Sequence, residues 1–227
     1  MAETNVTEQE RTYWECPVLW PGSVAFVIGG GWSLSASRGE LKSLLQDKHV
    51  IGCNDAYLLG DWIDICFFGD QEWYRKENEN GVQHRYALAD WSGLKITRCL
   101  NWKNESQLLL LHTANVWQDR PKFIGWFGNT GACAVNLAGK LGAKKIVLVG
   151  FDMTQNPHNG KKGSNNWHPN KVVTSERTYE NFREAFSNDV KPAAEKRGIE
   201  IINATPGSKL DCFPIVTLKE AVQACGF

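Results

Sequence analysis

The chain has 227 residues, of which 42% are hydrophobic and 22% are charged, and its 25 basic residues balance its 25 acidic ones. This length suits one large α/β domain, and the composition is that of an ordinary globular protein. Zero net charge argues against tight non-specific binding to nucleic acid, although a local basic patch is compatible with it.

The N-terminal residues 1–22 predict an extended arm that ends in WPG and precedes a single domain over 23–227. The first residues are polar and acidic, unlike a signal peptide. No run of about 18 apolar residues occurs, so we expect no transmembrane helix. Seven cysteines without a CxxC pair are typical of a reduced, cytoplasmic protein without structural zinc.

A buried strand is predicted over Val24–Ile28, and the glycine turn GGGWS follows it directly. A helix should come next, because leucines recur at helical spacing between 34 and 45. Strand, glycine turn and helix is the arrangement that aims backbone N–H groups and a helix dipole at a phosphate. The turn is weak evidence by itself, because Leu34 stands where a full GxGxxG motif would place a glycine, and no GxxxxGK[ST] P-loop occurs.

The next two strands also end in polar or glycine-containing turns. His49–Cys53 leads into Asn54-Asp55, and Ile63–Phe68 leads into Gly69-Asp70. In open α/β sheets ligands bind at the carboxyl ends of the strands. These turns therefore predict part of a binding rim, although Asn54-Asp55 also fits a simple cap for the segment after it.

Residues 75–122 predict a small insertion. Leu94–Cys99 and Leu108–Leu111 look like its strands, and Gln71–Gly81, which overlaps its beginning, suggests a short helix and loop.

The most regular stretch of the chain is AKKIVLVGFD, residues 143–152, whose apolar run Ile146–Val149 predicts a strand covered on both faces. Gly150 allows a tight turn, and Asp152 then lies just past the strand. Upstream, GNTG at 128–131 leads into a helix that ends near Leu141.

A long polar loop, Thr154–Asn170, comes next and contains His158, Lys161, Lys162 and His168. Polar loops of this length are usually functional lids or disordered. A long helix over Thr174–Lys196, capped by Ser175 or Thr174, a last strand at Ile199–Ile202 and a closing helix at Thr217–Cys225 complete the chain. The pattern predicts a Rossmann-like α/β fold with a largely parallel sheet and helices on both faces.

The order of these motifs resembles that of a group of phage-encoded proteins. The motifs are the glycine turn with Ser-Leu, the strand ending in Asn, the GNTG helix start, LGAKKIVLVGFD, the His-bearing loop and NATPGSKLDCFP, over roughly residues 24–220. Those proteins are similar to the Rossmann-type bacterial sialyltransferases and to hydroxymethylpterin diphosphokinase-like proteins.

The resemblance implies a glycosyltransferase that uses a nucleotide sugar and needs no metal. Carried over by motif, Gly30 and Ser33 would face the nucleotide phosphates, and Asn54 would contact the nucleotide. Thr130 would stand near the phosphate, and His168 would be the catalytic base.

Two departures from the sialyltransferase pattern concern the donor. Gly69-Asp70 stands where those enzymes have an asparagine, and no tyrosine lies between Asp152 and Tyr179 to stabilise the leaving phosphate. Lys161 and Lys162 are candidates for that charge role. The departures favour another activated sugar over cytidine-linked sialic acid.

Glycosyl transfer needs a stabilised leaving group, a base for the acceptor hydroxyl, and exclusion of water. Backbone N–H groups at the two glycine turns suit the first need, a histidine the second and a closing loop the third. His158 is the second candidate for the base, and Asp70 with Asp152 could instead bind a divalent cation. The candidate catalytic residues are His168, Asp152 and Asp70, and the candidate substrate-binding residues are Gly30, Gly31, Ser33, Asn54, Asp55, Asn129, Thr130, Gly131, His158, Lys161 and Lys162.

Three functions remain open on the sequence. A glycosyltransferase would use a nucleotide-sugar donor without a metal, and a hydroxymethylated base of phage DNA is one possible acceptor. A diphosphokinase-like enzyme on a small heterocycle would need ATP and magnesium on Asp70 and Asp152. A non-catalytic nucleotide-binding protein of virion assembly is the third.

Overall fold

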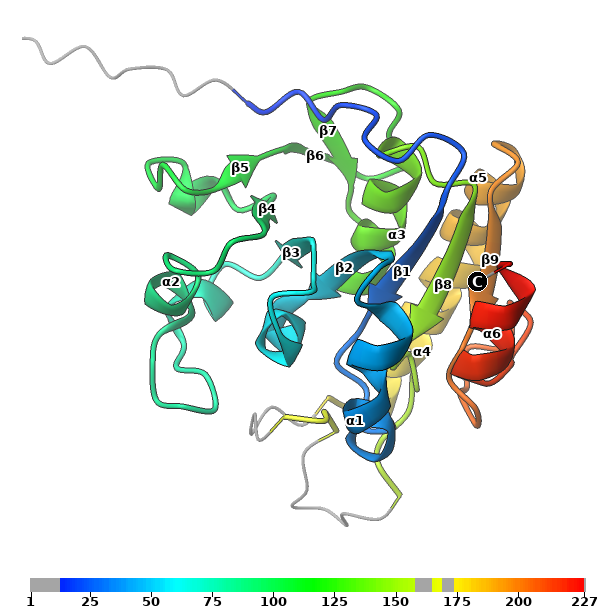
Figure 1. Ribbon diagram of the computed structural model, residues 1–227. Helices are drawn as coiled ribbons and strands as arrows, with labels where there is room; N and C mark the ends of the chain where they lie inside the picture. The colour runs from blue at the N-terminus through cyan, green and yellow to red at the C-terminus, as the bar shows by residue number, and fades with distance from the viewer. Residues whose placement is uncertain (1–12, 158–164, 169–173, 227) are drawn as a thin grey trace, which may run out of the picture.

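The computed structural model describes residues 13–157, 165–168 and 174–226. Its centre is a seven-stranded sheet with the strand order β5-β4-β3-β2-β1-β8-β9, in which every pair is parallel (Figure 1). The strands are β1 (Val24–Ile28), β2 (His49–Cys53), β3 (Ile65–Phe68), β4 (Leu94–Thr97), β5 (Leu109–Leu110), β8 (Lys145–Val149) and β9 (Glu200–Asn203).

Helices connect these strands, as parallel pairing requires. The longer ones are α1 (Leu34–Leu45), α3 (Thr130–Lys140) and α4 (Glu176–Ala185), and the shorter ones are α2 (His84–Ala87), α5 (Lys191–Glu195) and α6 (Leu218–Ala224). Short 3-10 turns are η1 (Asn54–Leu59), η2 (Trp73–Arg75) and η3 (Leu100–Trp102). In the described part of the chain, no helix has both the length and the apolar character needed to cross a membrane.

Side chains of β1 alternate between two apolar layers, one on each face of the sheet. Ala25 and Val27 pack in one layer with α3 and α5, whereas Phe26 and Ile28 pack in the other with α1 and α6. Successive residues of a strand point to opposite faces, so a strand that is apolar throughout needs cover on both. The predicted Rossmann-like fold, with a largely parallel sheet and helices on both faces, is confirmed.

Several predicted elements differ from the structure in their bounds, among them the third strand and the long helix over Thr174–Lys196. The third strand begins at Ile65. Just before it, the side chain of Asp64 accepts a 2.7 Å hydrogen bond from the N–H of Val50, and the N–H of Asp64 bonds to the carbonyl of Val50 at 3.1 Å. The predicted helix Thr174–Lys196 is three segments, with a π-helical turn, Phe186–Val190, between α4 and α5. Pro192 has no N–H to donate to the preceding turn, which accounts for the change in winding there.

Residues 75–122 contribute both to the main sheet and to a separate strand pair. Strands β4 and β5 extend the sheet beyond β3, while β6 (His112–Ala114) and β7 (Phe123–Gly125) pair with each other. The buried Asn136 of α3 ties this pair to the helix, because its Oδ1 accepts hydrogen bonds from the backbone N–H groups of Gln118 and Gly125.

Candidate functional site

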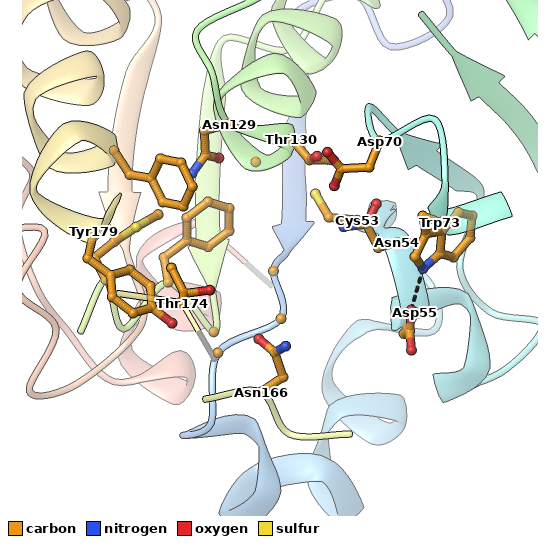
Figure 2. Close-up of a pocket in the computed structure, with 18 of the residues that line it drawn as sticks. Cys53, Asn54, Asp55, Asp70, Trp73, Asn129, Thr130, Asn166, Thr174 and Tyr179 are labelled. Carbon is orange, nitrogen blue, oxygen red and sulfur yellow. Dashed lines mark hydrogen bonds between the residues drawn. The ribbon is translucent and has the colours of Figure 1, made fainter. Parts of the chain in front are cut away.

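A cavity of about 570 Å³ lies at the carboxyl ends of the central strands. Its walls come from the turns after β1, β2, β3 and β8, the start of α3, the segment 165–168 and the beginning of α4 (Figure 2). This is the edge at which open α/β sheets bind ligands. The predicted site residues that line it are Gly30, Gly31, Asn54, Asp55, Asp70, Asn129, Thr130, Gly131, Asp152 and His168.

The turns after β1 and β8 lie in direct contact. Gly31 donates a 2.9 Å hydrogen bond to the carbonyl of Gly150, and a Cβ atom on Gly31 would lie 1.8 Å from Oδ2 of Asp152. That same Oδ2 accepts hydrogen bonds from the hydroxyl of Ser33 at 2.9 Å and from its N–H at 3.4 Å. A glycine is required at position 31 because the carboxylate occupies the space beside it.

Ser33 therefore differs in position from the other predicted residues. It does not line the main cavity but a second hollow between α1 and α6, and its hydroxyl is directed to Asp152. Burial raises the pKa of Asp152, and the two hydrogen bonds from Ser33 oppose that rise. The carboxylate of Asp152 thus lies at the start of α1, where a phosphate was expected.

His168 is held by a carboxylate from the turn after β2. Its Nδ1 lies 3.1 Å from Oδ2 of Asp55, and both side chains are buried. Its Nε2 lies towards the glycine turn, 3.9 Å from the position that a Cβ would take on Gly30. Burial lowers the pKa of His168, while the negative charges of Asp55 and Glu79 oppose that change.

Backbone contacts fix the segment that carries this histidine. The N–H of Trp167 bonds to the carbonyl of Gly30 at 3.1 Å, and Asn166 forms an antiparallel bridge with Gly31. The buried Asn165 donates to the carbonyl of Thr174 and accepts from the N–H of Asn156. His168 is therefore placed against the glycine turn by its neighbours in the sequence as well as by Asp55.

Asp55 also contacts a second histidine. Its Oδ1 accepts a 2.5 Å hydrogen bond from Nε1 of Trp73 and lies 3.4 Å from Nε2 of His84. His84 stacks on Trp73 with ring centroids 4.0 Å apart, and its Nδ1 meets the hydroxyl of Tyr57 at 3.0 Å. Burial lowers the pKa of His84 to about 4, against the opposing charge of Asp55. Nothing in the sequence pairs these residues.

Asn54 has two unusual features for a residue at a strand end. Its φ is 52°, in the left-handed region that non-glycine residues rarely adopt, although asparagine tolerates it better than most. Its side-chain Oδ1 is buried and has no hydrogen-bond partner among the described residues. A strained backbone and an unpaired acceptor on a cavity wall are typical of a ligand-binding position.

The start of α3 forms the wall between these turns. Asn129 is the N-cap and accepts a 3.0 Å hydrogen bond from the N–H of Ala132. Gly69 lies against Thr130, since a Cβ there would be 3.2 Å from the Thr130 hydroxyl, and Asp70 follows directly. Burial raises the pKa of Asp70, opposed by Lys76 and Arg98. Figure 2 shows Asn129 and Thr130 on the side of the cavity where α3 begins.

The wall opposite Asp55 comes from residues that the sequence did not single out. Tyr179 of α4 lines the cavity, is bonded to the side chain of Thr174, and lies across from Asp55 and Trp73 in Figure 2. Burial raises the pKa of Tyr179, so its hydroxyl stays protonated at neutral pH. The sequence feature that could have indicated this residue is a tyrosine near the start of an amphipathic helix. The other unpredicted lining residues include Gln71, Glu72, Lys76, Trp126, Phe151, Met153, Asn166 and Phe182.

The cation alternative required Asp70 and Asp152 to act together. Their strands, β3 and β8, are separated by β2 and β1, so at the usual strand spacing their ends lie about 14 Å apart. No group of three or more His, Cys, Asp or Glu side chains in the described ranges could hold a metal ion. The strand order therefore argues against one cation shared by these two carboxylates. His158, Lys161 and Lys162 lie outside the described residues.

No family model and no curated protein matches this sequence. Solved structures do match it, among them the MAf glycosyltransferase from Magnetospirillum magneticum AMB-1, with a TM-score of 0.61 and 15% identity. That match covers 94% of this chain, which spans only 38% of the length of the MAf chain. The sialyltransferase CstII from Campylobacter jejuni, in complex with cytidine-5'-monophosphate, aligns with a TM-score of 0.49 and 14% identity over 87% of this chain and 86% of its own. This chain thus shares its fold with the part of the MAf glycosyltransferase to which it aligns.

Proposed function

We propose that this protein is a glycosyltransferase that moves a sugar from a nucleotide-sugar donor to an acceptor hydroxyl. The observation that carries the proposal is a buried histidine, His168, held by Asp55 beside the glycine turn of a strand-end cavity. The volume of about 570 Å³ lies in the range of small-molecule sites. The fold shared with the MAf glycosyltransferase supports the reaction class.

The donor phosphate would lie at the start of α3. Helix N-termini attract phosphate through their N–H groups and their dipole. Both α1 and α3 begin at this edge, but the Asp152 carboxylate already lies at the start of α1. Asn129, Thr130 and Gly131 face the cavity, and Asn54 offers an unpaired acceptor to the nucleotide.

In the proposed reaction, His168 takes the proton from the acceptor hydroxyl as the oxygen forms its bond to the anomeric carbon. The bond between that carbon and the phosphate oxygen of the donor breaks, and the nucleotide leaves with the electron pair. The Tyr179 hydroxyl, protonated and on the cavity wall, would donate a hydrogen bond to the departing phosphate. Tyr179 would thus take the role of the phosphate-stabilising tyrosines that the sialyltransferase pattern has after the strand-end aspartate.

A panel of nucleotide sugars, with free nucleotide read by mass spectrometry, tests the proposal. Adding DNA that contains hydroxymethylated bases tests the phage DNA acceptor, and adding ATP with magnesium and a hydroxymethylated heterocycle tests diphosphate transfer. Release of nucleotide with one sugar donor supports the proposal. Transfer from ATP alone, or nucleotide binding without turnover, contradicts it.

Histidine variants locate the base. His168→Ala should lower turnover by about 10²–10⁴-fold and leave donor affinity nearly unchanged, because a general base contacts the acceptor. His112→Ala is the control, since His112 stacks on Phe123 in the β6–β7 pair and does not line the cavity. If His158→Ala loses turnover and His168→Ala does not, the base is His158. If both retain turnover, the histidine mechanism is wrong.

A further inference from the structure

The Asp55 carboxylate lies between two buried histidines, one on the cavity wall and one behind it. We propose that Asp55 is a positioning residue that holds His168 in the tautomer with the proton on Nδ1, so that Nε2 is the basic atom. This inference rests on the proposed function, in which His168 is the base. It assigns Asp55 a different role from the substrate contact expected from the sequence.

The two oxygens of Asp55 have different partners. Oδ1 is directed to Nε1 of Trp73 at 2.5 Å and to Nε2 of His84 at 3.4 Å, whereas Oδ2 faces Nδ1 of His168 at 3.1 Å. Trp73 and His84 belong to η2 and α2, so the carboxylate is anchored from the side opposite the cavity. The orientation of Asp55 is thus set by contacts that do not involve the ligand.

The chemistry of the partners fixes the proton positions. An ionised carboxylate only accepts hydrogen bonds, and a neutral imidazole carries one N–H. A proton on Nδ1 of His168 would face Oδ2 of Asp55 across 3.1 Å, and the lone pair would then lie on Nε2, on the side of Gly30. His84 takes the opposite arrangement, because its Nε2 faces Asp55 and its Nδ1 accepts from the Tyr57 hydroxyl.

The charges around His168 favour its use as a base. The ionisable groups that act on it are Asp55 and Glu79, with His84 across the shared carboxylate. The pKa of His84 is lowered to about 4, so His84 stays neutral near pH 7 and does not compete for the charge of Asp55. When His168 takes the acceptor proton, the imidazolium forms beside an anion that is already in place.

A purely structural network would predict different behaviour. In that case Asp55 would only tie η1 to η2 and α2, and its loss would lower stability without altering the ionisation or tautomer of His168. The pKa and tautomer of His168 therefore separate the two roles.

The test compares Asp55→Asn with wild type by ¹⁵N NMR of the histidine rings, using His168→Gln to assign the His168 signals. The asparagine can present its NH₂ to Nδ1, so the populated tautomer should change. The pKa of His168 should fall, because a carboxylate that favours the charged ring has been removed. Turnover should fall by about 10²–10⁴-fold, the range for losing general-base action, with donor affinity nearly unchanged. The acid limb of the pH profile should move to lower pH.

Asp64→Asn is the matched control. Burial raises the pKa of Asp64, and its carboxylate accepts a hydrogen bond from the backbone N–H of Val50 outside the cavity lining. It should lower stability and leave the His168 signals unchanged. Asp55→Glu keeps a carboxylate and should retain more of the wild-type pKa of His168 than Asp55→Asn does.

If Asp55→Asn does not fold, Trp73→Phe removes one donor to Oδ1 and keeps the carboxylate. The carboxylate then becomes a stronger acceptor for His168, so the pKa of His168 should rise. An unchanged His168 pKa and tautomer in the folded variant overturns the inference. The NMR readout needs no substrate, so it stands apart from the proposed function. If the His168 tautomer changes in Asp55→Asn but the wild-type protein transfers no sugar, the proposed function is refuted and the positioning role of Asp55 is supported.

Discussion

The hydroxyl of Ser33 donates a 2.9 Å hydrogen bond to Oδ2 of Asp152, a residue 119 positions away in the sequence. This bond joins the turn after β1 to the turn after β8, two neighbouring strands of the sheet. It places a carboxylate of the protein at the start of α1, and Gly31 makes room for it. The two turns are therefore coupled, and a substitution in either turn should change the conformation of both.

Gly31→Ala should destabilise the protein by about 1–3 kcal/mol, the usual range for overpacking. The added Cβ would lie 1.8 Å from Asp152 Oδ2 and 2.4 Å from the carbonyl of Gly150, so the two turns must separate. Chemical denaturation measures the loss. Gly39→Ala in α1 is the control: no atom lies within 4 Å of its new Cβ, so it should gain about 0.5–1 kcal/mol. Equal effects of the two changes would contradict the close contact.

Asn54→Gly should separate stability from binding. Glycine adopts the φ of 52° without strain, and the change removes a buried, unpaired acceptor, so stability should be unchanged or slightly higher. Donor affinity should fall about 5- to 30-fold, as expected for one lost hydrogen bond. Asn54→Ala should lose the same affinity but be less stable than Asn54→Gly. Calorimetry with the donor found in the panel measures affinity, and normal affinity of both variants would exclude Asn54 from the site.

Tyr179→Phe should lower turnover about 10- to 100-fold if the hydroxyl bonds to the leaving phosphate, since a hydrogen bond to a charged group contributes roughly 1.5–3 kcal/mol. Single-turnover kinetics at saturating donor measure the step. Tyr86→Phe is the control, because Tyr86 is 56% exposed and lies outside the cavity lining. A loss of affinity with normal single-turnover rate would mean that Tyr179 holds the donor and does not assist departure of the nucleotide.

The free energy of unfolding should fall as the pH is lowered from about 6.5 to about 4, in part through His84. Its pKa is about 4 in the folded chain against an ordinary value of 6.5, so in this window the unfolded chain binds a proton that the folded chain does not. Denaturant unfolding at pH 7.5, 6 and 5 measures the slope. His84→Asn should reduce it, although carboxyls whose pKa is raised, such as Asp70 and Asp152, contribute with the opposite sign. Parallel slopes for variant and wild type would show that His84 titrates normally.

The sequence by itself determined the parallel α/β sheet and the edge at which the cavity lies. Ile146–Val149 reads as a strand buried on both faces because each of its residues is apolar, and the helical spacing of leucines between 34 and 45 follows from 3.6 residues per turn. Polar residues such as Asn54, Asp70 and Asn129 came together because the carboxyl ends of parallel strands share one edge.

Only the tertiary structure decided which polar groups meet. The Asp55 carboxylate faces His168, Asp152 bonds to Ser33, and Tyr179 reaches the cavity from α4. Local periodicity reports which face of an element is buried, but partners distant in the sequence depend on strand order and on the direction of each side chain. Residues so far apart carry no shared local pattern, and for that physical reason the Asp55–His168 pair could be found only in the folded chain.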